Sequence, residues 1–142
     1  MDTPSLTMAQ QIAQAAGVFE QQRTGLVPQS VTVVQSNGTL VVTLHGALSP
    51  AEQALSRTPA GAAQVQEFHR ELFASASDAL RQEIKRITGV EVREATAEIE
   101  PATGTVVAVF TSGTVVHVYL LAHGIPAETW NASGLGDRHK TN

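Results

Sequence analysis

Histidine is the residue type in this sequence best suited to metal binding or proton transfer; there are five of them and no cysteine. His117 and His123 lie six residues apart near the end of a β-rich run. Six residues of strand cover about 20 Å, so the two imidazoles could not share one zinc ion without a sharp bend. We therefore expect independent surface or edge-strand histidines, and we predict no metal site.

His45 and His69 are two further candidates for chemistry. His45 precedes Gly46 at the end of a predicted strand, and His69 lies in the middle of a predicted helix beside its apolar stripe. Neither has another histidine three or four residues away, and no acidic residue at helical metal spacing from His69 would also face inward. We interpret His69 as packing near the edge of the core.

Paired carboxylates and nucleophiles give no catalytic signature. Glu91, Glu94, Glu98 and Glu100 are close in sequence, but acid–base catalysis needs carboxylates that converge in a pocket. The even-numbered members would share one face of a strand, which is more typical of a solvated side. The glycine-rich stretch 134–136 lacks the strand and helix of a phosphate loop, and no Ser or Thr has a nucleophile-elbow context. The sequence thus predicts no catalytic residue and no cofactor.

The single tryptophan, Trp130, stands just beyond a predicted strand end. Large aromatic side chains are mostly buried, so one interpretation is that Trp130 caps the edge of the core. Tryptophan is also enriched at protein interfaces, so the other interpretation is an anchor for a second subunit or a partner. The sequence leaves both open.

The composition fits one folded domain and excludes nucleic-acid binding. The chain has 142 residues, 9 basic and 13 acidic, with a net charge of −4. Neutralising phosphates requires clustered Lys and Arg, and no such cluster occurs. Only 15% of the residues are charged, against a usual share of about 25%. A small protein with so few surface charges often hides part of its surface in an oligomer, so we predict a homodimer.

Targeting and membrane signals are absent from the sequence as given. No run of 18 apolar residues occurs, so we expect no direct insertion into a membrane. The first residues lack the basic region and apolar core of a signal peptide. We therefore predict a cytoplasmic protein.

Helix starts are marked in a repeated way. A hydroxyl residue at the N-cap followed by proline at the first helical position occurs three times, and Ser49 with Glu52 adds a capping box. The helices predicted from these signals are Pro4–Gln22, Pro50–Arg57 and Pro59–Thr88.

The helix predicted over Pro59–Thr88 has the strongest periodicity in the chain. Apolar residues recur every three or four positions, and Gly89 follows as the residue that ends the helix. Roughly 29 residues at about 1.5 Å each would span about 43 Å. That exceeds the width of a domain of this size, so we expect a kink, for which residues 75–77 are the softest point, or a protruding end.

The strands are predicted as a hairpin and a meander. Ser30–Gln35 and Thr39–His45 are joined through Asn37-Gly38, which suits a tight hairpin turn. The meander strands are Val90–Ile99, a central strand Thr105–Thr111 buried on both faces, and Thr114–Ala122. We predict an α+β two-layer sandwich: a mainly antiparallel sheet of about five strands, covered by the long helix and a shorter N-terminal helix. The domain spans residues 1–133, and residues 134–142 form a disordered tail.

With these segments in place, residues 9–111 resemble a known family. Gly25-Leu26-Val27-Pro28, the stretch 44–55, Phe68-His69-Arg70-Glu71-Leu72 and the stretch 87–92 match its pattern. These are similar to the MpsC-like family, named after a Na⁺-translocating, membrane-potential-generating system. Members usually carry a Gly-Arg-Gly-Pro-like turn, whose basic residue is missing here. The segment from Val115 onward is also longer than the family pattern.

The resemblance implies an accessory of a membrane ion or bicarbonate system, and it offers no catalytic residue to carry over. Our leading prediction is a non-enzymatic homodimer that binds a partner, in a membrane-associated protein complex. The alternative is a small-ligand-binding or catalytic domain that uses Arg70, His45, Glu52 and His69 near the helix junction. Arg70 and Glu52 are the polar positions that recur in the family-like segments, although the capping box alone explains Glu52.

Overall fold

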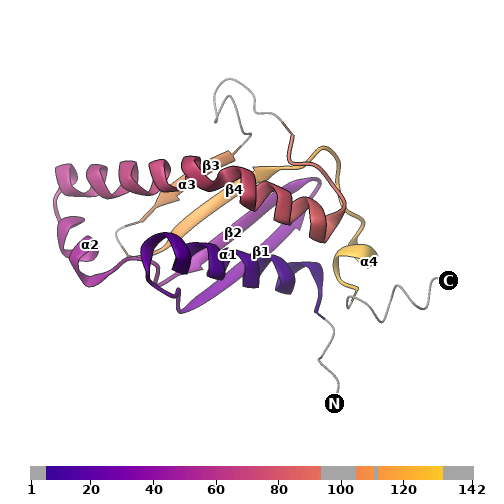
Figure 1. The fold of residues 1–142 in the computed structure, drawn as a ribbon, viewed down its shortest axis with the longest axis horizontal. Helices are drawn as coiled ribbons and strands as arrows, with labels where there is room; N and C mark the ends of the chain where they lie inside the picture. Colours follow the sequence, from indigo (N-terminus) through magenta and orange to yellow (C-terminus); the bar gives the residue numbers. More distant parts are fainter. Residues whose placement is uncertain (1–5, 94–104, 111, 133–142) are drawn as a thin grey trace, which may run out of the picture.

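The computed structural model describes residues 6–93, 105–110 and 112–132, shown in Figure 1. The elements in chain order are α1 (Met8–Thr24), β1 (Ser30–Ser36), β2 (Thr39–His45), α2 (Pro50–Leu55), α3 (Pro59–Thr88), β3 (Thr105–Val109), β4 (Val115–Leu120) and α4 (Ala127–Trp130). The predicted α+β class is confirmed. The predicted tail, residues 134–142, lies outside the described residues.

The four strands form one antiparallel sheet in the order β1-β2-β4-β3. The sequence predicts about five strands. Over residues 90–93 the expected extra strand is represented by a single antiparallel bridge between Val92 and Leu121, and residues 94–99 lie outside the described part of the chain. The predicted strand count is therefore not confirmed, whereas the antiparallel sheet is.

Among the described strands, the interior position in the second half of the sheet belongs to β4 rather than to the segment Thr105–Thr111, for which the sequence predicts a central strand. β4 pairs with both β2 and β3, while β3 pairs with β4 alone among these strands. Residues 94–99 of the predicted neighbouring strand lie outside the described residues. Among the side chains of β3 whose burial the structure describes, Val109 is buried, whereas Val107 and Ala108 are partly exposed. An apolar run can form an edge strand when one of its faces packs on a helix, and α3 makes that contact here.

This strand order also overturns the prediction that His117 is a surface or edge-strand histidine. His117 lies in the interior strand β4, on the side that faces the helices, and is 3% exposed. His123 follows the end of the strand and is exposed, as predicted.

Helices α1 and α3 lie side by side across the sheet (Figure 1). Phe19 of α1 meets Phe73 of α3 edge to face, with ring centroids 6.4 Å apart, and Phe73 in turn packs on Tyr119 of β4. Alternate strand residues point into this layer, as the period of two in a strand requires. The fully buried strand side chains are Leu40, Val42, Leu44, Val115 and Tyr119.

The long helix α3 has the predicted bounds, Pro59–Thr88. The side chain of Thr58 accepts a hydrogen bond from the backbone N–H of Gly61, and Gly89 ends the helix with φ 75°. Figure 1 shows that α3 runs along the molecule and changes direction about halfway. Near that point the hydroxyl of Ser75 donates to the carbonyl oxygen of Leu72, a bond of the kind that bends helices.

The ends of the other two predicted helices need correction. α1 begins at Met8, because Thr7 supplies the cap and forms a capping box with Gln10; the predicted start at Pro4 is wrong. α2 ends at Leu55 rather than at Arg57, and its capping box between Ser49 and Glu52 is confirmed. The hairpin is also confirmed: Ser36 pairs with Thr39 across Asn37 and Gly38, which have φ 52° and 82°.

Candidate functional site

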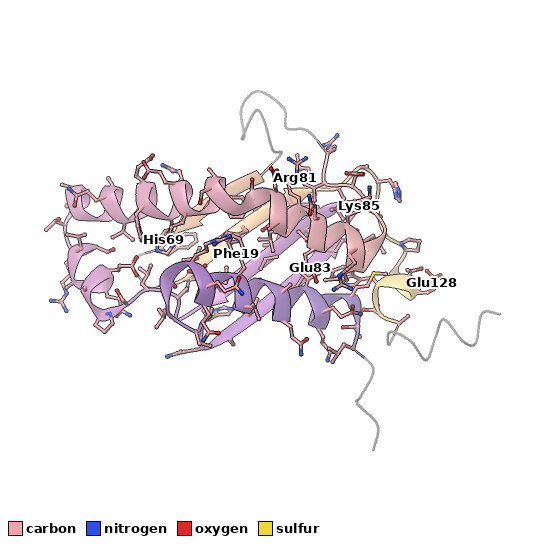
Figure 2. All side chains as sticks on the ribbon, in the orientation of Figure 1. Phe19, His69, Arg81, Glu83, Lys85 and Glu128 are labelled. Atoms are coloured by element: carbon pink, nitrogen blue, oxygen red, sulfur yellow. The ribbon has the colours of Figure 1, made fainter. Side chains whose placement is uncertain are left out.

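The polar centre of the structure is His69, which lies on α3, is 4% exposed and stands between two glutamates. Its Nε2 lies 2.9 Å from Oε2 of Glu52 on α2, and its Nδ1 lies 3.9 Å from Oε2 of Glu20 on α1. In Figure 2, His69 lies between α3 and α1. We call Glu20, Glu52 and His69 the acid–histidine cluster. It joins three helices through one imidazole.

Glu52 is positioned by the start of α2. Its Oε1 accepts the backbone N–H of Ser49, while the hydroxyl of Ser49 accepts the backbone N–H of Glu52. This reciprocal capping box fixes the carboxylate, and the other oxygen, Oε2, is then available to His69. The capping box therefore explains only one of the two oxygens of Glu52.

A close approach between α2 and α3 supports the same arrangement. At Gly61, in the first turn of α3, an added Cβ would lie 1.8 Å from the carbonyl oxygen of Leu55 at the end of α2. Only a residue without a side chain fits this contact. Gly61 thus lets α2 fold back against α3, which brings Glu52 to His69.

Glu20 is the least satisfied member of the cluster. It is 4% exposed, and its Oε2 has no hydrogen-bond partner among the described residues. Burial, together with the nearby charge of Glu52, raises the pKa of the Glu20 carboxyl from 4.5 to about 7. Glu20 therefore exchanges its proton close to neutral pH.

The two contacts of the His69 imidazole differ in length. Nε2 lies within hydrogen-bond distance of Oε2 of Glu52, whereas the 3.9 Å gap between Nδ1 and Oε2 of Glu20 exceeds a hydrogen bond. The contact with Glu52 is therefore the closer of the two.

A second buried pair lies beneath the cluster, on the sheet. Nδ1 of His117 is 3.3 Å from the hydroxyl of Tyr119, and the His117 ring packs against the ring of Phe73 at an angle of 57°, with centroids 4.6 Å apart. Burial, with a contribution from His69, lowers the pKa of His117 to about 3. Burial, with a contribution from Glu20, raises the pKa of Tyr119 well above 10. Both groups are neutral at pH 7.

A pocket of about 250 Å³ opens beside the cluster. Glu52 is the member of the cluster that lines it. On the α1 side the charged lining residue is Arg23, whose guanidinium lies 5.3 Å from the ring centroid of Phe19. The remaining lining residues are Thr24, Leu55, Gln64, Val65 and Phe68. A small ligand in this pocket would meet one cation, one carboxylate and an aromatic ring.

In the part of the chain that the structure describes, no group of three or more His, Asp and Glu side chains is arranged to hold a metal ion. In the same residues, no helix is long and apolar enough to cross a membrane.

The comparison with protein families matches this chain over residues 5–113 to MpsC, described as "Na+-translocating membrane potential-generating system (MpsC)". The chain belongs to the MpsC family. Curated proteins and solved structures give no match. The MpsC match includes the whole acid–histidine cluster but ends before β4, so His117 and Tyr119 lie beyond it. The resemblance stated from the sequence is thereby confirmed.

The structure brings together two of the five site residues predicted from the sequence, which are His45, Glu52, His69, Arg70 and Trp130. Glu52 and His69 are in direct contact. Arg70 points away, 57% exposed, and pairs with Glu67 at 3.6 Å on the surface of α3. His45 lies at the end of β2, where its Nε2 is 3.1 Å from the hydroxyl of Thr32. Trp130 is 8% exposed and packs into the core. This placement fits the interpretation of Trp130 as a residue at the edge of the core.

Two residues of the site, Glu20 and Tyr119, were not singled out from the sequence, and His117 was interpreted there as a surface or edge-strand histidine. A signal for Glu20 was present, because it falls one helical turn after Ala16 and directly follows Phe19, both of which are buried. A glutamate in the apolar stripe of a helix indicates a buried, paired carboxyl. His117 and Tyr119 alternate with half-buried residues along β4, but their burial depends on the strand order, which spacing alone does not reveal.

Proposed function

We propose that the protein is a non-enzymatic accessory of a membrane ion or bicarbonate system, that it acts as a cytoplasmic homodimer, and that it meets the membrane through a partner protein. The observation that carries this proposal is the MpsC match, whose description names a Na⁺-translocating, membrane potential-generating system. The low share of charged residues, 15%, supports the homodimer, because few charges leave much surface that can be buried against a second copy.

The acid–histidine cluster gives such an accessory a means of responding to protons. Glu20 has a pKa of about 7, and the groups that face it are His69, Glu52 and Tyr119. Loss of its proton puts a second negative charge beside Glu52, and the resulting repulsion acts between α1 and α2. We propose that this repulsion changes the position of α1 relative to α2, and thereby the surface that these helices offer for binding the partner.

Co-sedimentation with native membrane vesicles tests the proposal. The protein should sediment with vesicles that retain their membrane proteins and should stay in solution with protease-stripped vesicles or protein-free liposomes. Equal sedimentation with protein-free liposomes, or none with native vesicles, would overturn the partner-mediated role.

The proton response is tested with variants in the same assay. Binding of the wild type should differ between pH 6 and pH 8, and Glu20→Gln, which cannot ionise, should remove that difference. Glu71→Gln is the matched control, because Glu71 is exposed on α3. If Glu20→Gln and Glu71→Gln behave alike, the cluster has no part in partner binding.

The pocket beside Glu52 favours a second candidate function, binding of a small ligand. The sequence-based alternative combined Arg70, His45, Glu52 and His69. Of these four residues, Glu52 alone lines the pocket. Arg23 offers a positive charge on the α1 side, so a small anion such as bicarbonate is the ligand to test. Sodium bicarbonate should raise the Tm relative to sodium chloride at equal ionic strength, and Gln64→Trp, which fills the pocket, should abolish the difference. No difference in the wild type would exclude this candidate.

A further inference from the structure

All four strands lack charged residues. No Asp, Glu, Lys or Arg occurs in β1, β2, β3 or β4. The charged side chains of the described residues lie on the helices and in the connecting segments. The side of the sheet that faces α1 and α3 needs no charge, since it forms the core. The other side would normally carry polar and charged groups for contact with water.

The register shows what that other side carries instead. Val34 of β1 pairs with Val41 of β2, which pairs with Val118 of β4, so three valines form a row across the sheet. The adjacent row runs through Thr32, Thr43 and Val116. We call the side of the sheet with these six residues the outer face. It is apolar at its centre and uncharged throughout.

The described helices leave the outer face open. α1 and α3 pack on the opposite side, where Phe73 of α3 contacts His117 and Tyr119. On the outer face Val34 is 54% exposed, and Val41, Thr43, Val116 and Val118 are each partly exposed. An uncovered apolar face of this kind marks an interaction site.

We propose that the outer face is the interface of the homodimer, with two copies packed sheet against sheet. The inference rests on the homodimer of the proposed function and adds where the two copies meet. In a two-fold symmetric interface each residue near the axis faces its own counterpart, so any charge there would meet a like charge. A centre made of valine and threonine avoids this conflict, and packed antiparallel sheets of this composition form the core of β-sandwiches.

The size of the outer face is close to what a dimer needs. Four strands about 4.8 Å apart and five to seven residues long give a face of roughly 20 Å by 20 Å. Two copies then cover on the order of 800 Å² of projected area, and the uneven surface of the side chains and the rim of the face add to it. Specific interfaces begin near 1,000 Å² in total, so this face alone comes close to the required area.

The remaining segments of the chain fit this face less well than a second copy does. Residues 94–104 include three glutamates and residues 133–142 include Asp137, Arg138 and Lys140. Covering a valine row with either segment would place charges over apolar surface. A second outer face brings no charge to the contact.

Light scattering and sedimentation equilibrium on charge variants test the interface. The wild type should be a dimer at micromolar concentration, and Val118→Glu should weaken the dimer by about a hundredfold or more, because two glutamates would be buried near the axis without partners. Val18→Glu is the matched control, since Val18 is 52% exposed on α1 and the variant adds the same charge. It should remain a dimer.

Thr32→Glu and a crosslinking measurement guard against a folding defect in Val118→Glu. Thr32 is exposed on the edge strand β1, so Thr32→Glu should fold normally and still weaken the dimer. Because the chain has no cysteine, Thr43→Cys adds a single thiol, and a short bismaleimide should join two copies through it but not through Val18→Cys.

The possible outcomes distinguish the proposal that the outer face is the interface from the proposal that the protein is a homodimer. A wild-type dimer that persists in Val118→Glu and Thr32→Glu, with no crosslink through Thr43→Cys, would overturn the outer face as the interface and leave the homodimer standing. A monomeric wild type would overturn both, whereas the vesicle assay would still decide the accessory role.

Discussion

Glu52 and His69 hold two helices together through a single carboxylate. One oxygen of Glu52 accepts the backbone N–H of Ser49 at the start of α2, and the other lies 2.9 Å from Nε2 of His69 on α3. Helix capping and tertiary packing are thus coupled in one side chain. Substitution of Glu52 should therefore lower the stability by more than substitution of a residue that only caps a helix.

Replacing Glu52 by alanine should destabilise the protein by roughly 2 kcal/mol. The change removes a capping interaction and leaves the buried Nε2 of His69 without its acceptor. Ser49→Ala removes the cap alone and should cost about 1 kcal/mol. Urea unfolding of both variants measures the difference. Equal losses would show that the contact with His69 contributes nothing to stability.

Replacing Gly61 by alanine should cost roughly 1–3 kcal/mol, because the new methyl group would meet the backbone of α2 and the helices must shift apart. Gly17→Ala is the matched control. Gly17 lies inside α1 with nothing within 4 Å of an added Cβ, so alanine there should stabilise by about 0.5–1 kcal/mol. The ¹⁵N shifts of His69 should change in Gly61→Ala only; unchanged shifts would contradict the positioning role of Gly61.

Arg70→Ala should leave stability within about 0.5 kcal/mol of the wild type. The pair with Glu67 is exposed on both sides, and exposed pairs on a helix contribute little. Thermal unfolding measures the effect, and the vesicle assay should also be unaffected. A loss of vesicle binding in Arg70→Ala would instead identify the surface of α3 as the partner contact.

The elements of this fold that could be predicted from sequence are those fixed by local chemistry. Ser49, Thr58 and Gly89 mark helix ends because hydrogen bonds within a few residues satisfy the exposed backbone groups there. Asn37 and Gly38 mark the hairpin because both adopt positive φ. The start of α1 was placed too early because two hydroxyl residues, Thr3 and Thr7, could serve as its cap.

The strand order and the candidate site depend on contacts between distant parts of the chain. Glu52 and His69 are 17 residues apart on different helices, so no helical spacing rule relates them. Glu20 comes from a third helix. β3 and β4 are similarly apolar, and only pairing with β2 distinguishes the interior strand from the edge. The periodicity of apolar residues indicates which face of a helix or strand is buried, but it does not indicate which other element packs against that face.

His117 should remain neutral under mildly acidic conditions. Its pKa in the folded protein is lowered to about 3 from 6.5, so the stability that it contributes is fully present above pH 6.5 and is lost as the pH falls toward 3. His117→Asn, which keeps an acceptor for Tyr119 and cannot be protonated, should lose less stability than the wild type between pH 6 and pH 4. The His117 Hε1 resonance should not move between pH 8 and pH 5; a titration in that range would contradict its burial.

Glu20 should produce the opposite dependence on pH. Its pKa is about 7 in the folded protein and 4.5 when exposed, so between these values the folded state binds more protons than the unfolded state. The free energy of unfolding therefore falls as the pH rises from 4.5 through 7, by up to about 3 kcal/mol from this group. Glu20→Gln has no carboxyl at this position and therefore lacks this pH dependence. The stability of Glu20→Gln relative to the wild type should increase from pH 5 to pH 8. Urea unfolding at four pH values measures this, and parallel profiles would show that Glu20 does not titrate in the folded state.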